Sequence, residues 1–333
     1  MYGFCVWSNI PLPLPELPRE GPQDTDIRLV VNCLGESFIE RSPPGFPIYE
    51  AKTRNGQRLV SIYKQQERAY LVQWYELADF YIPLDNRQIV CFPRDGPSME
   101  YIWPCLIGPV FSFALAQWGT ICLHASAVNF RGQAISFLAM RGGGKSTLGL
   151  YFLKKGHALV TDDILPLAEN AGEIYAVPSY PEMKLWPETV VHFLGEGIEL
   201  PKVHPEIEKR WVEMGKVYGT FSPDPLPLRA IYLLELDHLD QGETGVTITP
   251  LDRKEGMMVL IKNTSQVAML NHKLLAHRFG LYAQIATQIP IRRLRFERRF
   301  ELLPLAYSAI LNDLAGLSVQ SPMGDKRQDL ERI

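Results

Sequence analysis

Residues suited to phosphate chemistry gather in one stretch, residues 133–167, which reads QAISFLAMRGGGKSTLGLYFLKKGHALVTDDILPL. An apolar run is followed by three glycines, by Lys145, Ser146 and Thr147, by an amphipathic segment, and then by Asp162 and Asp163. Glycines leave their backbone amides uncovered, and a helix that begins near Ser146 would direct its positive dipole end to the same point. This order predicts a phosphate site followed by a metal or base site.

The glycine-rich turn predicts a nucleotide site formed by Gly142, Gly143, Gly144, Lys145, Ser146 and Thr147. The Lys145 ammonium group would contact the β- and γ-phosphates, and the Ser146 hydroxyl would bind Mg²⁺. The pattern G-x-x-x-x-G-K-[ST] starts at position 139, where the chain has Ala139 instead of the first glycine. A predicted strand before the loop and a predicted helix after it are the context that this motif requires, so we expect nucleotide binding.

The two adjacent acids follow a predicted strand that begins at residue 157, and we expect them at its end. In open α/β sheets, ligands collect at the carboxyl ends of strands, which would place both carboxylates at the phosphates. Neighbouring residues on extended backbone point to opposite sides, so one acid could hold Mg²⁺ while the other faces an incoming hydroxyl as general base. We assign the metal to Ser146 and Asp163, although the residues alone leave the two roles interchangeable.

A histidine lies upstream of the loop, in the segment LHASAV at residues 123–128. A hairpin at Arg131-Gly132 would join this strand to the strand before the loop and bring His124 close to the phosphates. There it would tune the pKa of the aspartate that serves as general base, or contact a phosphate. The predicted catalytic group is therefore His124, Lys145, Asp162 and Asp163.

The composition excludes several other classes of protein. The chain has 333 residues, 46% of them hydrophobic, and a net charge of −3, so it offers no basic surface for nucleic acid or an anionic membrane. Its five cysteines are odd in number and never in C-x-x-C spacing, which argues against a disulfide framework and favours a reducing cytoplasm. We see no signal peptide and no apolar run near the ~20 residues of a spanning helix.

The pattern of short runs predicts an N-terminal, mainly antiparallel β domain at residues 1–97, with a hairpin at Asn55-Gly56. Its aromatic residues, including Trp74 and Tyr75, fit cross-strand packing, and its position favours a role in substrate docking or assembly. A catalytic domain follows at residues 98–317. Residues 318–333 are polar and unpatterned, which predicts a disordered tail.

Further elements of the catalytic domain are predicted by spacing. A buried helix is expected at 108–119, and an extended run at 176–186 carries Lys184, which could face the transferred phosphoryl group. A polar loop or short helix is expected at 200–210, with Lys202, Lys209 and Arg210 as solvated charges. Helices are expected within 253–284, an edge strand at 291–296 and a closing helix at 302–314.

The residues quoted above resemble a known family. LHASAV, the phosphate loop and KKGHALVTDD resemble the catalytic domain of bacterial HPr serine kinase/phosphorylase, in the HPr kinase and phosphoenolpyruvate carboxykinase-like superfamily. The whole chain, through LPLPEL, PSYPEMKLW and PIRRLRF, also resembles HPr kinase-like proteins encoded in lasso-peptide clusters. Members of that group phosphorylate the C-terminal serine of a precursor peptide.

This resemblance implies an α/β (α+β) fold with a P-loop kinase core of that type, and ATP and Mg²⁺ as cofactors. It also implies that His124, Asp162 and Asp163 are catalytic and that the phosphate loop binds the nucleotide. The predicted function is an ATP-dependent kinase acting on an accessible serine of a short peptide or small protein. Two alternatives stay open: a kinase of a small hydroxylated metabolite, and an ATP-sensing interaction protein without transfer, which Ala139 keeps in play. A homo-oligomer is also left open.

Overall fold

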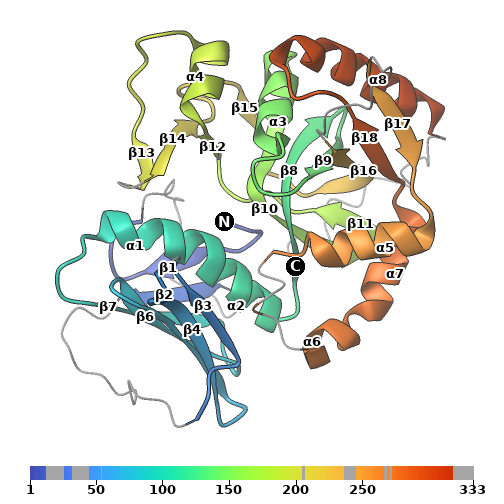
Figure 1. Ribbon diagram of the computed structural model, residues 1–333. Helices are drawn as coiled ribbons and strands as arrows, with labels where there is room; N and C mark the ends of the chain where they lie inside the picture. The colour runs from blue at the N-terminus through green and yellow to red at the C-terminus, as the bar shows by residue number, and fades with distance from the viewer. Residues whose placement is uncertain are drawn as a thin grey trace.

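The computed structural model describes residues 1–12, 26–31, 45–53, 55–204, 207–235, 245–265, 269 and 272–317. The predicted tail at 318–333 and most of the LPLPEL segment lie outside these residues. The described chain has a mixed α/β fold built on a seven-stranded sheet, an eight-stranded sheet and a small three-stranded sheet (Figure 1).

The seven-stranded sheet is the N-terminal layer, with strand order β1-β2-β7-β6-β5-β4-β3. Its pairs are antiparallel from β7 to β3, as predicted, while β1 and β2 add in parallel at one side. The strands are β1 (Val6–Ser8), β2 (Ile27–Val31), β3 (Tyr49–Lys52), β4 (Arg58–Gln65), β5 (Ala69–Trp74), β6 (Ala78–Pro83) and β7 (Gln88–Pro93). The predicted turn between β3 and β4 contains Gly56 with a φ of 80°, a conformation that favours glycine.

A continuous helical segment covers this sheet, formed by α1 (Met99–Cys105), the π-helical turn η1 (Leu106–Val110) and α2 (Phe111–Gln117). It begins earlier than the helix predicted at 108–119. Among the described residues it is the one helix long and apolar enough to cross a membrane, and 61% of its most apolar window is buried within the protein. That burial is typical of a core helix. From the sequence we expected no apolar segment long enough to span a bilayer, but this helical segment has 19 residues.

The eight-stranded sheet carries the second layer, in the order β11-β10-β8-β9-β16-β18-β17, with β15 paired to β10. Its strands are β8 (Ile121–Phe130), β9 (Gln133–Leu138), β10 (Ala158–Asn170), β11 (Glu173–Ala176), β15 (Thr220–Phe221), β16 (Leu226–Glu235), β17 (Thr247–Pro250) and β18 (Ile291–Arg295). Its helices are α3 (Lys145–Lys154), α5 (Arg253–Lys262), α6 (His272–His277), α7 (Phe279–Gln288) and α8 (Leu303–Gly316), the last preceded by the 3₁₀ turn η3 (Phe300–Leu302). Apolar residues of α3 and α8 fill one face of the sheet, and those of α5 and α7 fill the other.

The position of β18 in this sheet differs from the prediction. β18 lies between β16 and β17, so the stretch at 291–296 is not an edge strand. Its arginines are accommodated inside the sheet because acids neutralise them: Arg292 Nε lies 3.1 Å from Asp313, and Arg293 Nε lies 3.0 Å from Glu235.

A three-stranded sheet with the order β12-β14-β13 stands beside α3, together with helix α4 (Pro187–Leu194). It is formed by β12 (Glu182–Leu185), β13 (Lys202–His204) and β14 (Ile207–Glu213), so the loop or short helix predicted at 200–210 is wrong. Val203 and Val212 are buried while their neighbours are more exposed, which is the alternation of a half-buried strand.

The two layers share apolar core. Cys122 of β8, Ile164 of β10 and Tyr180 are buried in the same cluster as the seven-stranded sheet and helix α2. The Tyr2 hydroxyl donates a hydrogen bond of 2.7 Å to the carbonyl of Ile107, also within this cluster. The N-terminal layer is therefore packed directly against the sheet that carries the phosphate loop, and the domain division at residue 97 stays a prediction.

Glu182 gives a stability prediction that depends on pH. Burial, and then the charge of Glu213 directly opposite it on β14, raise the pKa of Glu182 from 4.5 to about 7. An acid with a raised folded pKa binds its proton more tightly in the folded state, so stability is lost as pH rises from about 4.5 to about 7. We expect Glu182→Gln to raise the free energy of unfolding at pH 8 by about 1 to 2 kcal/mol.

Chemical denaturation at pH 8 and at pH 5 measures this effect, and the gain should shrink at the lower pH. Glu196→Gln, at an exposed position, is the matched control and should change little at either pH. An equal gain at both pH values would contradict the assignment of the effect to the Glu182 charge.

Candidate active site

The register of three strands places the phosphate loop beside the two acids. Strand β8 runs antiparallel to both β9 and β10, so β9 and β10 point the same way on either side of it. Ala125 of β8 pairs with Leu138, the last residue of β9, and also with Asp163 of β10. The hairpin between β8 and β9 turns at Arg131-Gly132, as predicted. The acids therefore lie level with the start of the phosphate loop.

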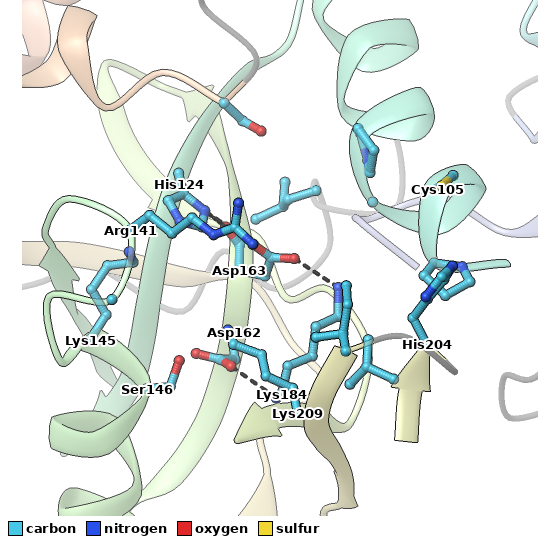
Figure 2. Close-up of a pocket in the computed structure, with 18 of the residues that line it drawn as sticks. Cys105, His124, Arg141, Lys145, Ser146, Asp162, Asp163, Lys184, His204 and Lys209 are labelled. Carbon is cyan, nitrogen blue, oxygen red and sulfur yellow. Dashed lines mark hydrogen bonds and ion pairs between the residues drawn. The ribbon is translucent and has the colours of Figure 1, made fainter. Parts of the chain in front are cut away.

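The acids lie in the middle of β10, and the prediction that they end a strand is wrong. β10 continues to Asn170 because β8 begins at Ile121 and supplies partners as far as Leu167. Asp163 has a φ of 95°, in the left-handed region, which costs a residue other than glycine on the order of 1–3 kcal/mol. This distortion interrupts the expected alternation, and both carboxylates line the same cleft (Figure 2).

Packing within the phosphate loop accounts for alanine at position 139, where the motif has glycine. A Cβ on Gly143 would lie 2.7 Å from the Ala139 methyl and 2.9 Å from the Met140 carbonyl oxygen, so glycine at 143 leaves room for alanine at 139. Gly144 has a φ of 82° and caps the start of α3. Lys145 Nζ donates a hydrogen bond of 3.1 Å to the Ala139 carbonyl. The loop therefore keeps its turn conformation with alanine at position 139.

This packing predicts a loss of nucleotide binding for Gly143→Ala. The added methyl must displace the loop backbone, so we expect nucleotide affinity to fall by about 10-fold to 100-fold while the melting temperature changes little. Ala139→Gly is the matched control, because it removes a methyl from the same contact and should bind as the wild type does. Calorimetric titration with Mg-ADP measures both, and unchanged affinity in Gly143→Ala would contradict this account of the loop.

Lys145 and Asp162 face each other at the base of the loop. Lys145 is 7% exposed, and burial lowers its pKa, with Asp162 and Asp163 acting in the opposite direction. Asp162 Oδ2 accepts a 3.2 Å hydrogen bond from the Lys184 amide, and both this amide and the nearby Ser146 hydroxyl act to lower the pKa of Asp162. Burial is the main cause that raises the pKa of Asp162.

The second oxygen of that carboxylate fits a metal site. Asp162 Oδ1 is buried and has no hydrogen-bond partner among the described residues, and an unpaired buried carboxylate oxygen is costly. It stands beside the Ser146 hydroxyl, and both are hard oxygen ligands of the kind that Mg²⁺ prefers. Within the described part of the chain, no group of three or more His, Cys, Asp or Glu side chains could hold a metal. A site of few protein ligands suits Mg²⁺, which usually keeps waters and phosphate oxygens.

Asp163 is held by two partners. Its Oδ1 lies 3.1 Å from His124 Nδ1, and its Oδ2 lies 2.8 Å from Lys184 Nζ. Burial acts to raise the pKa of Asp163, but the charge of Lys184 and the contact with His124 outweigh it and hold the pKa well below its ordinary value. About 30% of this side chain is exposed to the cleft, so a ligand can reach it.

Lys184 lies in the cleft and has a partner that the sequence did not indicate. We expected that it could face the transferred phosphoryl group, which stays a prediction, and the structure pairs it with Asp163 and places it over the Trp211 ring at 5.2 Å. Burial acts to lower the pKa of Lys184, and Asp163 more than reverses this. Lys184 therefore positions Asp163 and keeps it ionised.

The acids lie at the bottom of a cleft of about 1230 Å³. One wall is the phosphate loop, and the second is the three-stranded sheet. The third comes from Trp74 and Tyr75 of the N-terminal layer and from Tyr101 of α1. The sequence suggested cross-strand packing for Trp74 and Tyr75, which also line this cleft. Pockets that bind one drug-sized ligand have volumes of ~300–1,000 Å³, so this cleft is larger than such a pocket.

Comparisons with known proteins give a limited result. No protein-family model matches the chain, and no curated protein sequence matches it. Among solved structures it is similar to the HPr(Ser) kinase/phosphatase from Coxiella burnetii, with 14% sequence identity and a TM-score of 0.32. The match covers 59% of this chain and 97% of that chain. We therefore infer what this chain does chiefly from the side chains of its own cleft.

Proposed function

We propose that this protein is an ATP- and Mg²⁺-dependent kinase that phosphorylates a hydroxyl group. The observation that supports it most is the different state of the two neighbouring acids. Asp162 has a buried, unpartnered oxygen beside the phosphate loop, whereas Asp163 is held ionised and open to the cleft. A buried carboxylate oxygen without a partner can bind a cation, and an ionised carboxylate open to the cleft can accept a hydrogen bond and then a proton from a hydroxyl.

The phosphate loop would hold the nucleotide. Backbone amides of the three glycines and the start of α3 would bind the β-phosphate, with Lys145 and Thr147 adding contacts from the same side. Asp162 and Ser146 would hold Mg²⁺, which when bound neutralises charge on the phosphates. This assigns the metal to Asp162 instead of Asp163, the acid that we favoured from the sequence.

Asp163 would act on the acceptor. The acceptor hydroxyl would lie against Oδ1 or Oδ2 and give its proton to the carboxylate as its oxygen attacks the γ-phosphorus. The new oxygen–phosphorus bond forms as the bond to the β-phosphate bridging oxygen breaks, and ADP leaves. His124 and Lys184 fix the direction of the carboxylate, and because they favour the ionised form, the base needs no prior deprotonation.

The acceptor that we propose is a serine of a short peptide or small protein. The sequence resemblance suggests in particular the C-terminal serine of a lasso-peptide precursor. The breadth of the cleft supports a peptide over a small metabolite, because aromatic residues of the N-terminal layer and α1 extend the lining well beyond the acids.

Transfer from γ-labelled ATP to a panel of hydroxyl acceptors tests this proposal. The panel contains serine peptides with internal and C-terminal serines, small serine-containing proteins, free serine and sugars. Label on a serine peptide supports a peptide kinase, and label on free serine or a sugar only would show a metabolite kinase. ATP binding without transfer to any acceptor would favour a nucleotide-sensing protein and overturn the proposal. Lys145→Ala is the control for labelling by a contaminant.

A further inference from the structure

Lys209 lines the cleft but has no role in the phosphoryl transfer proposed for this protein. It extends from β14, the central strand of the three-stranded sheet, and its Nζ lies over the Trp186 ring at 5.5 Å. It lines the cleft on the wall opposite the phosphate loop (Figure 2). From the sequence we expected a solvated charge, and the structure adds that this half-buried lysine lines the cleft.

The acids nearest to the neighbouring cations are already paired, and none of them forms an ion pair with Lys209 among the described residues. Lys184 is neutralised by Asp163, and on the other side of β14 both Lys202 and Arg210 pair with Glu208. Lys209 itself forms no ion pair with any described residue. Trp186 supports its stem and ammonium group, so the side chain is held toward the cleft without being neutralised.

The position of Lys209 is complementary to that of Lys145. Lys145 lines the cleft from the phosphate loop and Lys209 lines it from β14, and the Asp162 carboxylate lines the same cleft (Figure 2). Asp162 carries one negative charge between two cations, so the group keeps an excess positive charge that an anionic ligand would offset. A terminal phosphate, with several anionic oxygens, suits the space between these two ammonium groups.

We propose that Lys209 is a second phosphate-binding residue, which contacts the terminal phosphoryl group of the nucleotide from the side opposite Lys145. The inference rests on the nucleotide-binding part of the proposed function and not on the identity of the acceptor. During transfer, negative charge spreads over the equatorial oxygens of the phosphoryl group, and a cation on each side stabilises it.

Calorimetric titration of Lys209→Met with a magnesium complex of a non-hydrolysable ATP analogue and with Mg-ADP tests the proposal. Methionine keeps an apolar stem over Trp186, so the wall of the cleft should be preserved. We expect affinity for the analogue to fall by about 10-fold or more while affinity for ADP is retained, because only the triphosphate reaches Lys209. Lys209→Arg should restore most of the preference for the triphosphate. Arg210→Gln, the next residue on the same strand, is the matched control and should bind as the wild type does.

Two results would overturn the role of Lys209: unchanged affinity for the analogue, or an equal loss for analogue and ADP, which indicates a general disturbance of the cleft. These results differ from a failure of the proposed function. If the wild type transfers phosphate to no acceptor but Lys209→Met still loses only triphosphate affinity, the kinase proposal fails and the Lys209 site stands.

Discussion

Replacing Asp163 by asparagine is expected to reduce phosphoryl transfer by about 10²- to 10⁴-fold, the usual contribution of a positioned general base. Asparagine has nearly the same shape but cannot accept the hydroxyl proton. Because the phosphate loop and Asp162 are unchanged, affinity for Mg-ATP should remain close to that of the wild type. Initial rates of transfer, together with calorimetric titration of nucleotide, measure the two effects separately.

The same substitution removes the partner of Lys184, so its effect on folding must be separated from its effect on chemistry. A lysine left buried without its carboxylate destabilises a protein. The double variant Asp163→Asn/Lys184→Met should recover thermal stability without recovering transfer. Asp224→Asn, at an exposed position outside the cleft, should behave as the wild type. Full transfer by a folded Asp163→Asn variant would contradict the role of Asp163 as base.

Replacing Asp162 by asparagine is expected to remove the magnesium dependence of nucleotide binding and to reduce transfer by about 10²- to 10³-fold, the cost of losing one electrostatic contact to developing charge. The neutral amide is a poorer Mg²⁺ ligand than a carboxylate. The readout that does not depend on activity is thermal unfolding with ADP, in the presence and absence of Mg²⁺. Mg²⁺ should increase the stabilisation by ADP in the wild type and not in Asp162→Asn.

The comparison between the two acid variants assigns their roles. If Asp163→Asn loses the magnesium effect and Asp162→Asn keeps it, the metal belongs to Asp163, as we expected from the sequence, and our assignment from the structure is wrong. If each variant affects only its own measurement, the roles are those proposed above.

The phosphate loop and its neighbours could be predicted from sequence because their contacts are local. The loop is one continuous motif, and a short hairpin at Arg131-Gly132 is enough to bring His124 beside it. A mainly antiparallel N-terminal β domain was likewise indicated by short β-rich runs and a turn signal, but the parallel pairing of β1 and β2 was not. The extent of β10 was not, because it depends on how far β8 continues past the acids. The left-handed backbone of Asp163 has no sequence signal, since only tertiary packing imposes such a conformation.

The remaining cleft residues could not be assigned from sequence because they come from distant elements. Lys184 and Lys209 face the acids only after β12 and β14 pair, and Trp74 reaches the cleft only because the two layers share a core. From the sequence, Ala139 departs from the phosphate-loop motif, and the motif gives no reason for the departure because it allows any residue at position 143. The structure shows that the two residues are matched in size.

The most direct test of the central claim is a mass spectrum of serine peptides after incubation with the protein and Mg-ATP, compared with the same mixture and Asp163→Asn. We predict that the wild type adds one phosphoryl group, that fragmentation places it on the serine oxygen, and that Asp163→Asn modifies the peptides about 10²- to 10⁴-fold more slowly. If the wild type binds Mg-ATP with normal affinity but every peptide in the mixture remains unmodified, the conclusion that this cleft phosphorylates a peptide serine is contradicted.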